Sequence, residues 1–101
     1  MPTLIVYDLS DGHTPVKRRC LRAGFRDCTR THAGVWKRLP NTTLWHPNDN
    51  IHAVFRLFRT IVHAVEAHQN MIIEIEKLYG LPKVPGLIDS DEECDGPQSY
   101  R

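Results

Sequence analysis

The sequence predicts an α+β domain in which two amphipathic helices lie on one face of a four-stranded antiparallel sheet, followed by an acidic tail. Three observations predict this fold. The chain opens with an apolar, β-favouring segment, a regular helical stripe follows Asn50, and the elements alternate as strand, helix, strand, strand, helix, strand. A length of 101 residues fits one domain with a single core.

The first strand is predicted over Thr3–Leu9, and its near-continuous apolar pattern is typical of a central, buried strand. Asp8 closes this strand, and Asp11-Gly12 forms a turn. A helix is expected to start with Thr14 as N-cap and Pro15 at its first position, and to run to about Ala23. Gly24 suits the end of this helix. One side carries apolar residues and the other is strongly basic: Val16, Cys20 and Leu21 against Lys17, Arg18 and Arg22.

The middle of the chain is predicted to form a long, interrupted β-hairpin. Strand segments are expected at 26–32, 35–39 and 42–46, with a turn at Ala33-Gly34. Pro40-Asn41 breaks the second arm because proline cannot donate to a sheet, which favours an edge or bulge position.

The second helix is predicted from Ile51 to about Ala67, with a cap supplied by the loop 47–50. Apolar residues recur along it at helical spacing: Ile51, Val54, Phe55, Phe58, Ile61, Val62 and Val65. Its opposite side carries His52, Arg56, Arg59 and His63. This basic strip is either a second binding surface or the solvated side of a core helix, and the second interpretation is favoured.

A last strand is predicted over 71–79, so that the domain covers residues 1–80 and an acidic, disordered tail covers 81–101. The element order βαββαβ is that of the ferredoxin-like fold. Its second sheet face and the hairpin edge are left uncovered, which predicts a homodimer.

The charge is distributed unevenly along the chain. Eight basic residues and one acid lie between His13 and Pro40, whereas the tail carries five acids against two bases. This separation indicates a polyanionic partner for the body, with the tail as an internal competitor, although solubility alone is the simpler explanation. No apolar run is long enough to cross a membrane, and no secretion signal is visible. Cys20, Cys28 and Cys94 lack framework spacing, so we expect reduced thiols in a cytoplasmic protein.

Several short motifs resemble those of two related nuclease groups. The segment Ile5-Val-Tyr-Asp-Leu-Ser-Asp11, the basic helix and Ala23-Gly-Phe25 look like the small CRISPR-associated adaptation endonucleases. Gly24-Phe25-Arg26, Gly34 and Leu39-Pro40 follow in the order that resembles GhoS-type antitoxin endoribonucleases. The resemblance spans roughly 3–79. It implies a ferredoxin-like homodimer of a toxin–antitoxin or defence system, and a divalent metal bound by the aspartate that matches Asp8.

One hypothesis is a nuclease, in which Asp8 and the basic residues have different roles. Two symmetry-related Asp8 carboxylates would hold Mg²⁺, which activates water and polarises a phosphoryl oxygen; Asp8 is thus the catalytic and metal-binding candidate. Trp36 and Trp45 are candidates for base stacking, or more simply core or dimer anchors. RNA or DNA phosphates would be bound by a basic set comprising Lys17, Arg18, Arg22, Arg26, Arg30, Lys37 and Arg38.

A non-catalytic hypothesis fits the same residues. Asp8 and Asp11-Gly12 are also ordinary turn chemistry, so the sequence leaves enzymatic activity open. A dimeric antitoxin or inhibitor would present its basic face or its free hairpin edge to a protein partner, and the edge could recruit a partner strand. No zinc spacing, phosphate-binding glycine loop or nucleophile motif is present.

Overall fold

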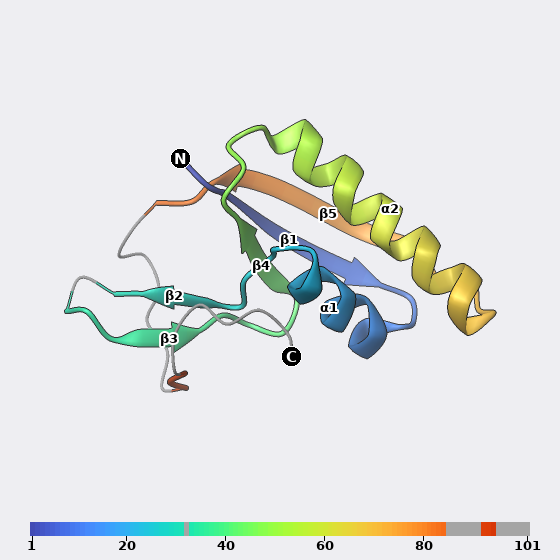
Figure 1. Cartoon of the computed structure of the whole chain (residues 1–101), viewed down its shortest axis with the longest axis horizontal. Coiled ribbons are helices and arrows are strands. Elements are labelled where there is room, and N and C mark those ends of the chain that lie inside the picture. Colours follow the sequence, from blue (N-terminus) through green and yellow to red (C-terminus); the bar gives the residue numbers. More distant parts are fainter. Residues whose placement is uncertain (32, 85–91, 95–101) are drawn as a thin grey trace.

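The computed structural model describes residues 1–31, 33–84 and 92–94, which form an α+β fold (Figure 1). Its helices are α1 (His13–Arg22) and α2 (Ile51–Gln69). Its strands are β1 (Thr3–Leu9), β2 (Cys28–Arg30), β3 (Trp36–Arg38), β4 (Thr43–His46) and β5 (Ile75–Pro82). Residues 85–91 and 95–101, which make up most of the predicted disordered tail, lie outside the described residues. Within the described part, no helix is long and apolar enough to cross a membrane.

The strands form two sheets where the sequence predicted one. β1 is central in an antiparallel sheet of order β4-β1-β5, and β2 and β3 pair separately. The two sheets touch at an isolated antiparallel bridge, in which Arg26 and Trp45 exchange both backbone hydrogen bonds (2.8 and 3.0 Å). The division follows from the predicted break at Pro40, where a turn closed by Thr43 N–H and the Pro40 carbonyl separates β3 from β4.

Both helices pack on one face of the three-stranded sheet, as predicted, and the core lies between them. β1 alternates in burial, so Ile5, Tyr7 and Leu9 point to the helices. The Phe58 ring of α2 lies 4.8 Å from Tyr7 and 6.5 Å from Phe25, measured between centroids. Elsewhere in the stripe predicted on α2, Val54, Ile61, Val62 and Val65 are buried, Phe55 packs against the core and Ile51 is half-buried. α1 contributes Val16 and Cys20.

Gly80 on β5 allows α2 to approach the sheet. A Cβ atom there would lie 2.7 Å from side-chain atoms of Ile51 and Phe55. Such contacts are shorter than van der Waals distances, so a larger residue would push the start of α2 off the sheet. The absence of a side chain at this position is therefore part of the core packing.

The helix ends differ partly from prediction. The predicted Thr14 cap is wrong: α1 begins at His13 with Gly12 as N-cap, in a left-handed conformation (φ 74°) and without a side-chain cap. The His13 ring instead contacts the Leu9 carbonyl (3.0 Å). The Asn50 side chain caps α2 through Ala53 N–H (3.1 Å), as the loop composition predicted, and α2 extends two residues further than predicted, to Gln69.

The bounds of several predicted strands are also corrected. The predicted strand 71–79 begins only at Ile75 and continues to Pro82, two residues past the predicted domain boundary. Residues 71–74 instead form an irregular connection, in which Ile73 N–H donates to the Glu66 carboxylate (3.0 Å) and competes with strand pairing. The predicted 26–32 and 35–39 strands shorten to β2 and β3 because regular pairing covers only three residues of each.

Two of the three cysteines are not reduced, contrary to prediction. Cys28 on β2 forms a disulfide with Cys94, 66 residues later, with the Cα atoms 6.6 Å apart. Cys20 alone is a free thiol, and it is buried in the core. The prediction failed because two cysteines so distant in sequence carry no spacing signal.

Candidate nucleic-acid interface

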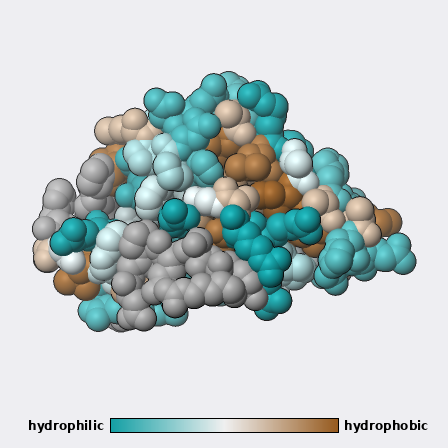
Figure 2. Space-filling model, viewed as in Figure 1, coloured by the Kyte–Doolittle hydropathy of each residue, from teal (hydrophilic) through white to brown (hydrophobic). Residues whose placement is uncertain are grey.

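A basic groove lies between α1 and the C-terminal end of α2. It has a volume of about 230 Å³ and is lined by Pro15, Arg18, Arg19, Arg22, Val65, His68 and Gln69. Three guanidinium groups and one imidazole thus surround a hollow whose apolar floor comes from two residues. In Figure 2, hydrophilic residues cover much of the face on which the helices lie, around a central hydrophobic area. Such a groove suits an anionic ligand with oxygen acceptors.

The helical repeat explains why these residues converge. Arg18 and Arg22 are one turn apart on the side of α1 opposite Val16 and Cys20, and Arg19 lies at the exposed edge of that side, three residues before Arg22. His68 lies in the last turn of α2, where the partial negative charge of the helix end favours a cation. Sequence reasoning missed Arg19 and His68 as groove residues. The i, i+3 and i+4 spacing indicated the arginines, but nothing in the sequence placed His68 beside them.

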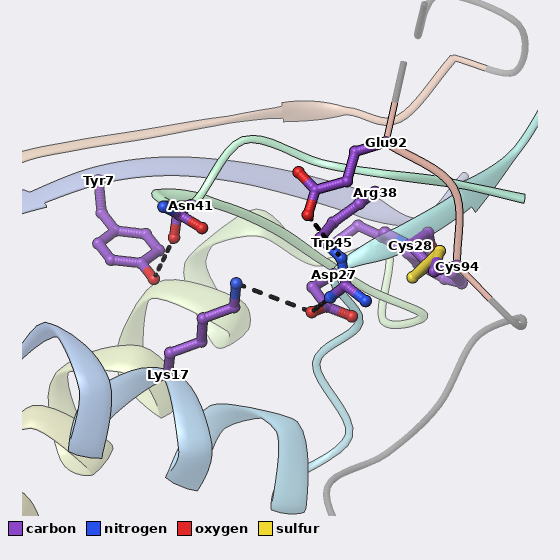
Figure 3. A network of polar contacts seen from close by, with 9 residues as sticks. All are labelled: Tyr7, Lys17, Asp27, Cys28, Arg38, Asn41, Trp45, Glu92 and Cys94. Atoms are coloured by element: carbon purple, nitrogen blue, oxygen red, sulfur yellow. Dashed lines mark hydrogen bonds and ion pairs between the residues drawn. A yellow bond between two sulfur atoms is a disulfide. The ribbon is translucent and has the colours of Figure 1, made fainter. Parts of the chain in front are cut away.

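Lys17 and Arg38, two further predicted phosphate contacts, face a buried carboxylate instead. Asp27 is 6% exposed. Its Oδ2 lies 2.6 Å from Arg38 Nη1 and 3.7 Å from Lys17 Nζ (Figure 3). Because a buried carboxylate needs such partners, these cations tie α1 to β3 and are neutralised in part by Asp27. A smaller role in binding an external anion follows for both.

The other predicted contacts are spread over the hairpin region. Lys37 pairs with Glu93 (3.5 Å), Arg26 donates to the Gly24 carbonyl (3.1 Å), and Arg30 donates to the Gly34 carbonyl (3.3 Å). These contacts hold turns and strand ends. The structure therefore gathers only Arg18 and Arg22 of the seven predicted basic residues in one groove.

Asp8 lies away from this groove. The β1 side chains that face the helices are Ile5, Tyr7 and Leu9, so Asp8 is on the outer sheet face, in register with Lys77 of β5. In residues 1–31, 33–84 and 92–94, no cluster of three or more His, Cys, Asp or Glu side chains suited to a metal is found. Asp8 by itself supplies one hard oxygen ligand of the type that Mg²⁺ uses, together with waters.

Trp36 lies on β3 and Trp45 on β4, and both are half-buried. Trp45 Nε1–H donates to the Cys28 carbonyl (2.7 Å), and Lys83 Nζ lies 5.1 Å from its ring centroid. A hydrogen-bonded indole with a cation over its face is fixed in place, which favours the structural role that the sequence also allowed.

A second hollow lies at the start of α1, with a volume of about 370 Å³. Its lining comprises His13, Thr14, Lys17 and Asn41. The neighbouring Tyr7 hydroxyl donates to the Asn41 carbonyl (3.4 Å) and belongs to the core side of β1. Burial raises the pKa of Tyr7 well above its ordinary value, so this group remains a neutral donor at physiological pH.

Comparison with protein-family models, curated proteins and solved structures gives no match to this chain. The function is therefore argued from the groove and the surfaces described above.

Proposed function

We propose that the protein is a small nucleic-acid-binding protein whose groove between α1 and α2 holds the phosphate backbone. The observation that carries the proposal is the convergence of Arg18, Arg19 and Arg22 with His68 around one hollow. Guanidinium groups donate to phosphate oxygens in a fixed fork, so three of them on one helix face suit consecutive phosphates. None of these side chains is needed to fill the core, in contrast to Val16 and Cys20 of the same helix.

We also propose a ferredoxin-like topology for the domain. The order β5-β1-β4, both helix positions and the Arg26–Trp45 bridge beside β4 support it. In this interpretation the residues around Arg26, just before β2, form a fourth strand of the sheet, next to β4. β3 and the end of β2 then extend beyond that sheet. The resemblance to the adaptation and antitoxin nucleases rests on the same element order.

A homodimer through the outer sheet face belongs to this proposal. Val6, Tyr79 and Leu81 on that face are 36%, 64% and 43% exposed. The pairing register places Val6 beside Tyr79, so these apolar side chains are neighbours. Covering them with the same face of a second copy would remove apolar surface from water.

Endonuclease activity is the second candidate, and the position of Asp8 favours it. Asp8 shares the outer face with Val6, so face-to-face pairing would bring two Asp8 carboxylates toward one another. Mg²⁺ held there would supply Lewis-acid activation of a phosphodiester. The chain's own contribution would be the carboxylates at the interface, on the sheet face opposite the arginine groove.

The binding proposal is tested with labelled single-stranded RNA and DNA over a series of salt concentrations. We expect the logarithm of the binding constant to fall linearly with the logarithm of salt concentration. Substituting Arg18, Arg19 and Arg22 with Gln should lower the magnitude of this slope by about 2, at about 0.7 for each phosphate contact on a single strand. Arg56→Gln, an exposed arginine of α2 outside the groove, is the matched control and should bind like the wild type.

An unchanged slope in the triple variant, with wild-type circular dichroism, would contradict the groove assignment. Endonuclease activity is measured in the same samples, as cleavage of the labelled nucleic acid in the presence of Mg²⁺ and in the presence of a chelator. Loss of cleavage in Asp8→Asn with unaltered binding would support it, whereas equal cleavage in the variant would reject Asp8 as the metal ligand.

A further inference from the structure

The short acidic segment Glu92–Cys94 is paired with the free edge of β3 as an added strand. Arg38 N–H donates to the Glu92 carbonyl (2.8 Å), and Cys94 N–H donates to the Trp36 carbonyl (3.2 Å). Between these bonds, Lys37 and Glu93 form an antiparallel bridge. The β3 edge therefore accepts an extended peptide through its main chain, which is how strand addition works between proteins.

The side chains of this pairing are complementary in charge. Glu93 lies 3.5 Å from Lys37 Nζ, and Glu92 lies 3.6 Å from Arg38 Nε. Both glutamates remain largely exposed, at 66% and 73%. Exposed ion pairs of this kind are weak and screened by salt, so they select an acidic peptide without holding it firmly.

The firm attachment is covalent. The disulfide joins Cys94 to Cys28 on β2, the strand that pairs with β3 on its other side (Figure 3). Cys28 is buried, whereas Cys94 is only half-buried. The disulfide thus fixes the acidic segment across the hairpin. Its cleavage removes the covalent part of an attachment that otherwise includes the two main-chain hydrogen bonds and the exposed ion pairs described above.

We propose that the β3 edge is a docking site for an acidic, extended peptide of a partner protein, and that the Cys28–Cys94 disulfide keeps it occupied by Glu92–Cys94. Reduction by a cellular dithiol opens the site. In that step the Cys28–Cys94 bond accepts two electrons and two protons to give two thiols, and the dithiol becomes a disulfide.

The observations favour a peptide over a nucleic acid as occupant. The edge presents an N–H of Arg38 and a carbonyl of Trp36 in strand register, and a second strand satisfies both. A phosphate group could accept from Arg38 N–H but has no donor for the Trp36 carbonyl, whereas a peptide strand presents an N–H and a carbonyl at this spacing. The site is also separate from the groove between α1 and α2, so this inference does not depend on the nucleic-acid proposal.

The first step of the test is peptide mapping of the full chain without reductant. We expect one linked pair of peptides, containing Cys28 and Cys94, which separates on treatment with a dithiol. A chain without this link, purified in air, would overturn the proposal.

The second step measures docking with a fluorescent peptide that spans residues 90–96 and carries serine in place of Cys94. The reduced chain, or Cys94→Ser, should bind it at least tenfold more tightly than the oxidised chain. A triple variant, Glu92→Lys, Glu93→Lys and Cys94→Ser, removes the internal competitor and should bind it more tightly still. Equal binding to oxidised and reduced protein, or none to the triple variant, would overturn the proposal.

Exchanging the charges of Lys37 and its peptide partner distinguishes direct docking from a change in the structure of the edge. Lys37→Glu in the triple variant should weaken binding of the acidic peptide, and a peptide with Lys in place of Glu93 should restore it. Salt-sensitive binding of RNA in place of the peptide at the reduced edge would assign the site to nucleic acid and reject the peptide.

Discussion

The three-stranded sheet with its helices and the β2–β3 hairpin are stabilised in different ways. The sheet and helices share one apolar cluster, in which Phe25, Phe58 and Ile5 are fully buried. The hairpin region contains two buried apolar residues outside that cluster, Cys28 and Leu39. Its other contacts, among the described residues, include ion pairs, hydrogen bonds and a disulfide.

The difference indicates which region stabilises the fold and which region can respond to salt concentration and redox state. Apolar burial scales with area, does not depend on redox state and is not screened by salt. Exposed ion pairs are screened by salt, and a disulfide depends on the redox state of its surroundings. The region around β3 is therefore suited to regulated contacts, while the core holds α1 and α2 in the positions that create the basic groove.

Thiol reactivity should separate the two regions most strongly. Burial raises the pKa of the Cys20 thiol from 9.0 to about 12, which lowers its thiolate fraction by about a thousandfold at neutral pH. We expect iodoacetamide to leave Cys20 unlabelled in the folded chain and to label Cys94 first after reduction. Mass spectrometry of the alkylated peptides measures the order of labelling. As a control, unfolding in guanidinium chloride after reduction should make all three cysteines reactive. Rapid labelling of Cys20 in the folded chain would show that the core is more open than described.

Truncation in the core should be the most damaging change in stability. Phe58→Ala removes a ring that contacts Tyr7 and Phe25, and we expect a loss of about 3–5 kcal/mol in the free energy of unfolding. Urea denaturation followed by circular dichroism measures it. Ile72→Ala, at an apolar residue that is 83% exposed and outside the proposed dimer face, is the control and should cost much less. Similar losses in both variants would contradict the assignment of the core.

Loss of the buried carboxylate should weaken the junction between core and hairpin. Asp27→Asn removes the buried negative charge that faces Arg38 and Lys17, and we expect a loss of about 2 kcal/mol in the free energy of unfolding. The exposed Asp49→Asn provides the matched control. The measurement is the melting temperature of both variants in thermal unfolding. Equal melting temperatures would mean that the ion pairs of Asp27 contribute nothing to stability.

The smallest effect concerns Glu66 and pH. Its carboxylate accepts from Ile73 N–H (3.0 Å) and contacts the His63 ring (3.0 Å), and both lower the pKa of Glu66 below its ordinary value of 4.5. A lowered folded-state pKa stabilises the fold above pH 4.5, and this contribution disappears as pH falls through the folded-state pKa. Glu66→Gln should therefore lower the melting temperature slightly at neutral pH and not at low pH. A difference that grows on acidification would contradict this sign.

The core and the element order were predictable because they depend on local patterns. The stripe from Val54 to Val65 repeats at helical spacing, and the Thr3–Leu9 segment is β-favouring and apolar, so α2 and the central strand β1 were found. The N-cap of α1 was missed because Thr14 and Pro15 carry a strong cap signal, while Gly12 takes a left-handed conformation that the sequence only permits.

The candidate groove was predicted only in part because it depends on contacts between distant segments. Helical spacing placed Arg18 and Arg22 together, but the approach of His68 depends on how α2 crosses α1. Lys17, Lys37 and Arg38 have acidic partners that only the fold brings near them. Charge alone could not distinguish a cation that binds a ligand from one that neutralises a buried or neighbouring carboxylate.

The most direct test of the central claim is a titration of ¹⁵N-labelled protein with a short single-stranded RNA, followed by NMR. If the groove between α1 and α2 binds the backbone, the amide shifts should concentrate at Arg18, Arg19, Arg22 and His68 and weaken with added salt. Shifts confined to β3 or to the outer face of β1 and β5, with α1 unaffected, would contradict it.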